Sequence, residues 1–338
     1  MHLKHVKLYK DLRKKCKSHI IKVMMRKIYN IVRTARPRQW LKNLSVFAAP
    51  LFAGTLLDTE VLTWSLQAFV AFCAISSGAY FINDVIDAPK DRLHPIKKNR
   101  AIASGEVRPV TAIVIAVILI SFSIIYSFSH LDDYFVFLLI LYIVVQFAYS
   151  LFLRNVIILD SLVVASGFMM RVLAGGFASR TSISSWIILT TIGISMLMAF
   201  GKRRSEKTIL AKLSDNPSEV ETRKTLRHYP DNLLDSMISI SASYTILTYS
   251  LFTFMTSPEE IGGKISAVLP SVLKTPKLMM LTIPLVIYGI ARYLYVIYEK
   301  GEGESPERVL LSDKPLLSTV LLWALSVFLI IYVFPGLN

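Results

Sequence analysis

The chain reads Asn83-Asp84-Val85-Ile86-Asp87-Ala88-Pro89-Lys90-Asp91-Arg92-Leu93-His94-Pro95 where a long apolar run ends. Asp84, Asp87 and Asp91 stand at i, i+3 and i+7, so on a helix they share one face. Carboxylates beside a membrane are costly unless a cation offsets them. Mg²⁺ prefers oxygen ligands, keeps several waters and binds substrate phosphates as well. The stretch therefore predicts a Mg²⁺–diphosphate site at the mouth of a membrane protein.

Cations follow the three aspartates closely, at Lys97, Lys98 and Arg100. Lys and Arg side chains hold phosphate oxygens through charge-assisted hydrogen bonds. We expect Lys97 and Arg100 to grip a diphosphate and Asn83 to support the metal ligands. The alternative is a plain solvated loop, which the density of opposite charges disfavours.

Composition places the chain among all-α polytopic membrane proteins, since 54% of its 338 residues are hydrophobic and only 18% are charged. The formal net charge of +15 does not indicate a nucleic-acid partner. The sequence has no aromatic-basic RNA signature, and no zinc-finger or helix-turn-helix pattern. Cys16 and Cys73 form no disulfide framework and no metal-binding spacing.

A membrane-spanning helix needs about 20 mostly apolar residues. The hydropathy pattern predicts nine such helices, of which the first is short and interrupted by Pro50 and Gly54. The nine expected spans are 41–57, 61–82, 109–129, 133–153, 158–178, 183–200, 232–256, 276–298 and 315–335.

The distribution of Lys and Arg predicts the orientation in the membrane. Most of these residues lie in 1–43 and in the loops 84–108, 201–230 and 299–314. Because positive charge marks cytoplasmic loops, we expect the N-terminus and these loops in the cytoplasm of a multi-pass inner-membrane protein. Nine spans put the C-terminus outside. The loops that carry chemistry therefore share the cytoplasmic face.

Residues 1–35 form a basic segment without the apolar core of a secretory signal, ahead of a membrane domain expected at 36–338. Two alternatives stay open for this segment. It is either an amphipathic helix on an anionic leaflet or a disordered basic tail. Its apolar positions come close to a helical stripe: Ile20, Ile21, Met24, Met25, Ile28 and Ile31.

Further polar residues stand at the ends of the predicted spans or inside them. Lys42 and Asn43 open the first span, as either an interfacial anchor or phosphate ligands. Asp160 and Arg171 are eleven residues apart and share a helix face, but about 16 Å of rise separates them. An internal pair is one reading. Because an unpaired Arg in a span is costly, a substrate phosphate or a third residue between them is the favoured one. Tyr149 and Arg154 lead into the same span.

Gly201-Lys202-Arg203-Arg204-Ser205-Glu206 follows the sixth expected span. A basic cluster there is often only a topology signal. The acidic loop follows the second expected span, and this basic cluster follows the sixth, four spans later. The spacing suggests a diverged internal duplication in which the two loops correspond, so Lys202 and Arg203 are candidate phosphate ligands. The last cytoplasmic loop, 301–308, is either a flexible acidic lid or a linker.

Taken together, these segments resemble the UbiA-type intramembrane prenyltransferase superfamily, and within it the polyprenyl-phosphate (decaprenyl-phosphate) phosphoribosyltransferase branch. The resemblance runs from Arg36 onward and implies a nine-helix bundle with a cavity open to the cytoplasm. One departure from the wider superfamily stands out. Members that use a prenyl diphosphate carry a second aspartate-rich motif after the sixth span, where this chain is mostly cationic. The segments that carry the resemblance are Arg36–Asn43, Asn83–Gly105, Asp160–Gly176, Gly201–Glu206 and Gly301–Leu311 with Asp313.

The resemblance implies transfer of 5-phosphoribose from phosphoribosyl diphosphate (PRPP) to a polyprenyl phosphate, with release of diphosphate, as a step in cell-wall biosynthesis. Mg²⁺ is the implied cofactor, on Asp84, Asp87 and Asp91. Asp84, Asp87 and Asp160 are the expected catalytic residues. The expected substrate-binding residues are Lys42, Asn43, Asn83, Lys97, Arg100, Tyr149, Arg154, Arg171, Lys202 and Arg203.

Two other functions stay open at this point. The first is a prenyltransferase of the same superfamily that uses a prenyl diphosphate and an aromatic or lipid acceptor. The second is a polyprenyl-lipid transporter, against which a metal–diphosphate cluster confined to one face argues. The sequence decides neither the length of the polyprenol nor whether the chain forms a homo-oligomer.

Overall fold

The computed structural model describes Lys22 and residues 24–93, 97–213, 229–256, 277–300 and 306–333. In this part of the chain the regular structure is helical throughout, with no strand. Eight helices in it are long and apolar enough to cross a membrane. The all-α polytopic prediction is therefore confirmed, and eight of the nine expected spans coincide with these helices to within a few residues, apart from C-terminal extensions of the second and sixth.

The expected first span, 41–57, has a different structure. A 3₁₀ helix, η1 (Pro37–Phe47), leads into the short α2 (Ala48–Phe52), and Gly54 then adopts a positive φ of 76°. Proline removes a backbone donor and glycine permits the left-handed turn, so a long α-helix does not form here. The count of nine spans is not confirmed.

The chain divides into two compact units. The smaller unit comprises Met1–Pro37 and Ser76–Ser121. Its described residues include a helix at 24–35, the second half of α3 (Thr59–Asp91), the short η2 (Lys97–Asn99) and the first half of α4 (Pro109–His130). An apolar core joins these elements through Phe81, Ala88, Ile102, Val107, Ala112 and Ala116.

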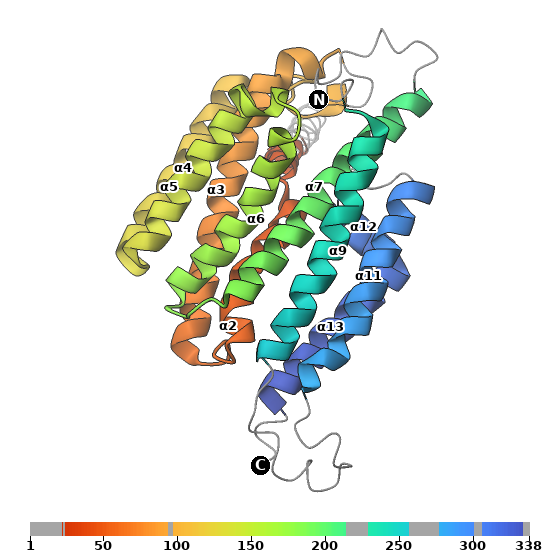
Figure 1. The fold of residues 1–338 in the computed structure, drawn as a ribbon. Helices are drawn as coiled ribbons and strands as arrows, with labels where there is room; N and C mark the ends of the chain where they lie inside the picture. The colour runs from red at the N-terminus through yellow and green to blue at the C-terminus, as the bar shows by residue number, and fades with distance from the viewer. Residues whose placement is uncertain are drawn as a thin grey trace, which may run out of the picture. The chain divides into compact units, whose positions relative to one another are not determined.

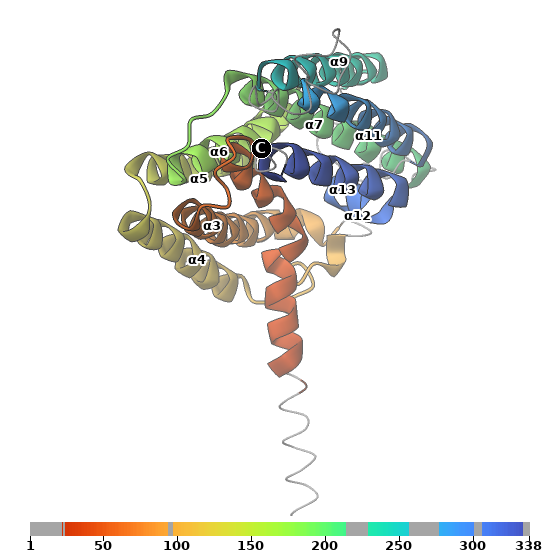
Figure 2. The ribbon, with the colours of Figure 1, turned by 90° about the horizontal axis from the view of Figure 1, so that it is seen from below.

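The larger unit comprises Arg38–Ile75 and Phe122–Asn338. Its helices pack mostly on their neighbours in the sequence, and Figure 1 shows α5, α6, α7 and α9 side by side. Near the C-terminus α11 packs against α13, as the view from below also shows (Figure 2). The helices of this unit after α4 are α5 (Asp133–Leu151), η3 (Leu153–Asn155), α6 (Leu159–Ala178), α7 (Ser185–Leu213), α9 (Asp231–Thr256), η5 (Leu278–Thr282), α11 (Ile283–Tyr295), η6 (Val296–Lys300), α12 (Pro306–Ser312), α13 (Lys314–Phe328) and η7 (Leu329–Val333).

One glycine explains how η1 lies so close to α6. A Cβ atom on Gly175 would stand 1.9 Å from the carbonyl oxygen of Val46. Only a residue without a side chain permits this backbone contact. The Gly175 position therefore sets the distance between α6 and the segment that carries Lys42 and Asn43.

Candidate functional site

The first polar cluster lies on the last turns of α3, in the smaller unit. α3 continues past residue 82 to Asp91, with Pro89 inside it, so the three aspartates do lie on one helix. Asp84 and Asp91 are both 5% exposed. The Asn83 side-chain amide donates to Asp87 over 3.1 Å, one turn along the helix. The predicted helical spacing of the acidic residues is confirmed.

Two arginines neutralise this acidic face. Arg36 donates to Asp84 over 2.5 Å, and Arg100 donates to Asp84 over 3.2 Å and to Asp91 over 2.7 Å. Arg100 was an expected site residue, but Arg36 was not assigned a role. Arg36 lies 48 positions before Asp84 and has a positive φ of 55°, which turns the chain between the 24–35 helix and η1. The sequence did offer one indication of this role, because the segment Arg36–Asn43 is expected at the same membrane face as the loop that carries Asp84.

A divalent metal fits part of this cluster. Mg²⁺ usually takes one or two carboxylates, with waters and substrate phosphates completing its shell. Asp84 and Asp87, one turn apart, offer that set. Asp91, the third expected ligand, accepts a hydrogen bond from Arg100, as Asp84 also does. Within the described residues no three acidic, His or Cys side chains gather closely enough for one metal ion, and the assignment of Asp91 stays a prediction. Lys97 lies in η2, beside the cluster in sequence.

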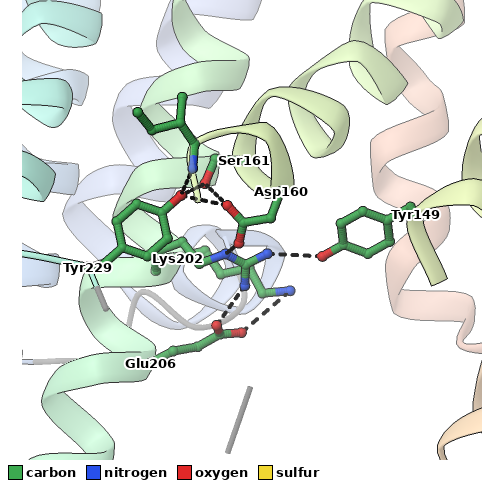
Figure 3. Close-up of polar contacts among 8 residues, drawn as sticks. Tyr149, Asp160, Ser161, Lys202, Glu206 and Tyr229 are labelled. Atoms are coloured by element: carbon green, nitrogen blue, oxygen red, sulfur yellow. Dashed lines mark hydrogen bonds and ion pairs between the residues drawn. The ribbon is translucent and has the colours of Figure 1, made fainter. Parts of the chain in front are cut away.

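The second polar cluster lies in the larger unit and centres on Arg203 of α7. Its Nε forms an ion pair with Asp160 of α6 at 2.6 Å, and its Nη1 contacts Glu206 at 2.6 Å. Its Nη2 donates to the Tyr149 hydroxyl of α5 over 3.0 Å (Figure 3). Arg203 is 2% exposed and Asp160 is fully buried. Because its guanidinium is committed on three sides, Arg203 ties α5, α6 and α7 together rather than presenting a free phosphate clamp.

Tyr229 completes this cluster on the side of Asp160. Its hydroxyl donates to Asp160 Oδ1 over 2.5 Å and accepts from the Ile158 backbone N–H over 2.6 Å (Figure 3). Ile158 precedes α6 with a positive φ of 68°. Burial, together with the hydrogen bond to Asp160, raises the pKa of Tyr229 to about 12, so the hydroxyl stays a donor at neutral pH. Sequence analysis missed Tyr229, since nothing in its local pattern marks it.

Asp160 and Arg171 do not form the internal pair that was one interpretation of the sequence, and the substrate phosphate expected between them stays a prediction. Asp160 binds Arg203 and Tyr229, and Arg171 has separate partners. Arg171 donates to the Asn43 side-chain oxygen over 2.7 Å, to the Gly167 carbonyl over 2.5 Å and to the Tyr142 hydroxyl over 3.0 Å. The physical reason is the rise of about 16 Å along α6 between the two residues, which is too long for a direct contact. Each charged group instead contacts groups on neighbouring elements.

Aromatic rings also surround Arg171. The guanidinium carbon lies 4.9 Å from the ring centre of Tyr142, 5.7 Å from that of Phe72 and 5.9 Å from that of Phe168. Ring faces attract a desolvated cation. Arg171 is 5% exposed, and no carboxylate among the described residues forms an ion pair with it. Protein groups therefore offset the cost of this buried charge, and Asn43 is one of them.

The three remaining expected site residues are all in the larger unit. Arg154 is in η3, and Lys202 is partly exposed with its ammonium 3.9 Å from Glu206. Lys42 is a lining residue of an apolar cavity of about 430 Å³ inside the larger unit. The cavity runs between η1, α7, α9, α11 and α13, and its other lining residues include Phe52, Phe168, Tyr249, Phe252, Leu310 and Trp323.

The chain is similar to several proteins of one name. It is 32% identical to a decaprenyl-phosphate phosphoribosyltransferase from Corynebacterium glutamicum over 314 residues, which cover 90% of this chain and 87% of the relative. It is 31% identical to a protein of the same name from Mycolicibacterium smegmatis over 310 residues, 90% of this chain and 93% of the relative.

Solved structures share the fold. A UbiA homologue from Archaeoglobus fulgidus bound to DMAPP and Mg²⁺ aligns with a TM-score of 0.63 at 15% identity, covering 89% of this chain and 99% of that chain. A digeranylgeranylglyceryl phosphate synthase aligns with a TM-score of 0.58, also at 15% identity and with the same coverage. The model of the UbiA prenyltransferase family matches residues 44–311. The chain belongs to the UbiA prenyltransferase family, as its sequence motifs predicted.

Proposed function

We propose that this protein transfers 5-phosphoribose from PRPP to a polyprenyl phosphate at the cytoplasmic membrane face, releasing diphosphate. The relatives named decaprenyl-phosphate phosphoribosyltransferase support this reaction, since they match about nine-tenths of the chain. A C-terminus outside and a cytoplasmic N-terminus belong to the same proposal.

The observation that carries the proposal is that the acidic residues around Arg203 are paired with this arginine. Family members that use a prenyl diphosphate carry a second group of metal-binding carboxylates after the sixth span. Here Asp160 and Glu206 are both bound to the buried Arg203. Removing a carboxylate from such a buried pair is costly. A second metal cage at this position is therefore disfavoured, and one metal–diphosphate site on α3 suits a single diphosphate donor such as PRPP.

In this proposal the acidic face of α3 binds the donor. Asp84 and Asp87 would hold Mg²⁺, and the bound ion would supply positive charge for the leaving diphosphate. Arg36 and Arg100 bind diphosphate oxygens, an exchange of carboxylate for phosphate partners that their part-exposed side chains allow. Lys97 adds a third cation to the same phosphate groups. Asp91 holds Arg100 in place.

The acceptor lipid uses the apolar cavity of the larger unit. Its isoprenoid tail lies among the apolar lining residues, and Lys42 attracts its phosphate. A phosphate oxygen is already anionic at neutral pH, so its attack on ribose C1 needs no general base. The new C–O bond forms as the bond to diphosphate breaks, with oxocarbenium character at C1 and inversion of configuration. Asp160, which is fully buried, acts by positioning α6 and α7 and not by contact with the substrate.

The test is diphosphate release by the purified protein in detergent, with PRPP, Mg²⁺ and a polyprenyl phosphate each omitted in turn. The proposal expects release only when all three are present, and a phosphoribosylated lipid as product. Turnover with a prenyl diphosphate and an aromatic acceptor, without use of PRPP, would instead assign the protein to the prenyl-diphosphate branch of its family.

A further inference from the structure

The helix at 24–35 in the smaller unit has three distinct sides. Successive residues are about 100° apart around an α-helix. On one side Asn30 and Thr34 are both 4% exposed, and Ile31 and Ala35 pack against the core that contains Phe81. The helix is thereby held to its own unit along one narrow side, which leaves most of its circumference facing outward.

The second side is apolar and exposed. Helical spacing places its five residues on one continuous arc, and their exposed fractions run from 47% to 65%. In water such a patch marks a surface for an apolar partner. The residues are Met24, Met25, Ile28, Tyr29 and Val32.

The third side is basic and adjoins the apolar arc. It carries Lys22, Arg26 and Arg33, all exposed, and residues 22–35 contain no Asp or Glu. A further exposed cation, Lys27, lies on the opposite flank of the apolar arc. Arg26 also forms an ion pair with Glu106 of the same unit. A partner for this helix must therefore offer an apolar layer beside a layer of negative charge, which is the arrangement at the surface of an anionic bilayer.

A second copy of the chain fits this surface less well. In a symmetric dimer the same patch faces itself. The basic side of one helix would then stand against the basic side of the other, with no acidic residue in either helix to compensate. Charge complementarity thus favours lipid head groups over another copy of this chain.

We propose that residues 24–35 form an in-plane helix that inserts its apolar arc into an anionic leaflet, with Lys22, Arg26 and Arg33 on the lipid phosphates. The helix ends one residue before Arg36, which bonds to Asp84 and lies 4.9 Å from the ring centre of Tyr80. The Ser77 hydroxyl donates to the Ala35 carbonyl over 3.1 Å. Lipid binding therefore holds Arg36 on the acidic face of α3. The proposal does not depend on the reaction assigned above.

The test is hydrogen–deuterium exchange of the full-length protein in nanodiscs of phosphatidylcholine, with and without phosphatidylglycerol. A Lys or Arg near an anionic surface changes partitioning by about fivefold. We expect the amides of 24–35 to exchange at least ~10-fold more slowly with the anionic lipid. The double variant Lys22→Glu/Arg33→Glu loses this protection, and the variant Ile28→Ser weakens it in both lipids.

Arg108→Glu is the matched control, because Arg108 is an exposed cation of the same unit that lies outside the helix. This variant should leave the protection of 24–35 unchanged. Exchange that is the same in both lipids would overturn the proposal. Protection that appears only in discs with more than one protein chain would also overturn it, by making a second copy the partner.

Discussion

The two arginine–aspartate clusters of this protein use the same chemical groups in opposite ways. On α3 the carboxylates of Asp84 and Asp91 are nearly buried, but their partners Arg36 and Arg100 keep 27% and 29% of their side chains exposed. Around Arg203 both the cation and Asp160 are sealed from solvent, at 2% and 0%.

This difference in exposure assigns different tasks to the two clusters. A part-exposed arginine can exchange a carboxylate for a phosphate at little cost, since neither state leaves a charge buried without a partner. A sealed arginine cannot, because each partner that leaves is left uncompensated in a medium of low polarity. We therefore interpret the α3 cluster as the binding site and the Arg203 cluster as a structural connection between helices.

The largest expected effect comes from removing the sealed cation. Arg203→Met leaves Asp160 without its counter-charge and Glu206 with Lys202 alone, and breaking a buried pair costs about 3–5 kcal/mol. The neighbouring Arg204 pairs with Asp235, whose side chain is 37% exposed, so Arg204→Gln is the matched control and should cost less than about 1 kcal/mol. Thermal unfolding in detergent measures both. Equal losses for the two variants would contradict the structural interpretation of Arg203.

The next effect should be large on turnover and small on stability. Asp84→Asn keeps the shape of the side chain but removes the charge proposed to hold Mg²⁺. Loss of one such electrostatic group typically lowers turnover by about 10²–10³-fold. Diphosphate release at saturating Mg²⁺ measures the change, with thermal unfolding as the check on folding. Asp133→Asn, at an exposed carboxylate at the start of α5, is the control. Near wild-type turnover in Asp84→Asn would remove Asp84 from the metal site.

The contrast between the clusters also marks what could be predicted from the sequence. Spans of apolar residues and the i, i+3, i+7 spacing of the aspartates are local patterns, and both were confirmed, because hydropathy and helical periodicity act within one element. The first expected span, which Pro50 and Gly54 interrupt, forms no single long helix, and its place as a span is not confirmed.

Partners on different elements were not predictable in the same way. The sequence indicated that Asp160 and Arg171 needed counter-groups, but Arg203, Tyr229 and Asn43 come from segments 43 to 128 positions away. No periodicity links such positions. The sequence predicts phosphate ligands at Lys202 and Arg203, and this role stays a prediction. Composition does not show burial, and burial is what commits Arg203 to the protein's own carboxylates.

A smaller effect will show whether Asn43 supports the protein or the substrate. In the structure its side-chain oxygen accepts from Arg171. Asn43→Leu keeps the volume but removes this acceptor, and a hydrogen bond to a charged group contributes about 1.5–3 kcal/mol. If Asn43 only positions Arg171, the free energy of unfolding falls while the KM values for PRPP and lipid stay unchanged. A raised KM for either substrate at unchanged stability would restore the phosphate-binding role expected from the sequence.

The smallest effect tests the edge of the sealed cluster through pH. Tyr229→Phe removes one hydrogen bond to Asp160, worth about 1 kcal/mol at neutral pH. The folded-state pKa of Tyr229 is raised to about 12 from an ordinary value of 10, so the folded state keeps its proton longer than the unfolded state. This contribution is complete below pH 10 and is lost as the pH rises towards 12. The stability of the wild type should therefore fall more steeply than that of Tyr229→Phe over this range, so that the two approach each other. Parallel curves measured by denaturation in detergent would mean that the Tyr229 hydroxyl titrates as it does in water, and that the cluster is open to solvent on the side of Asp160.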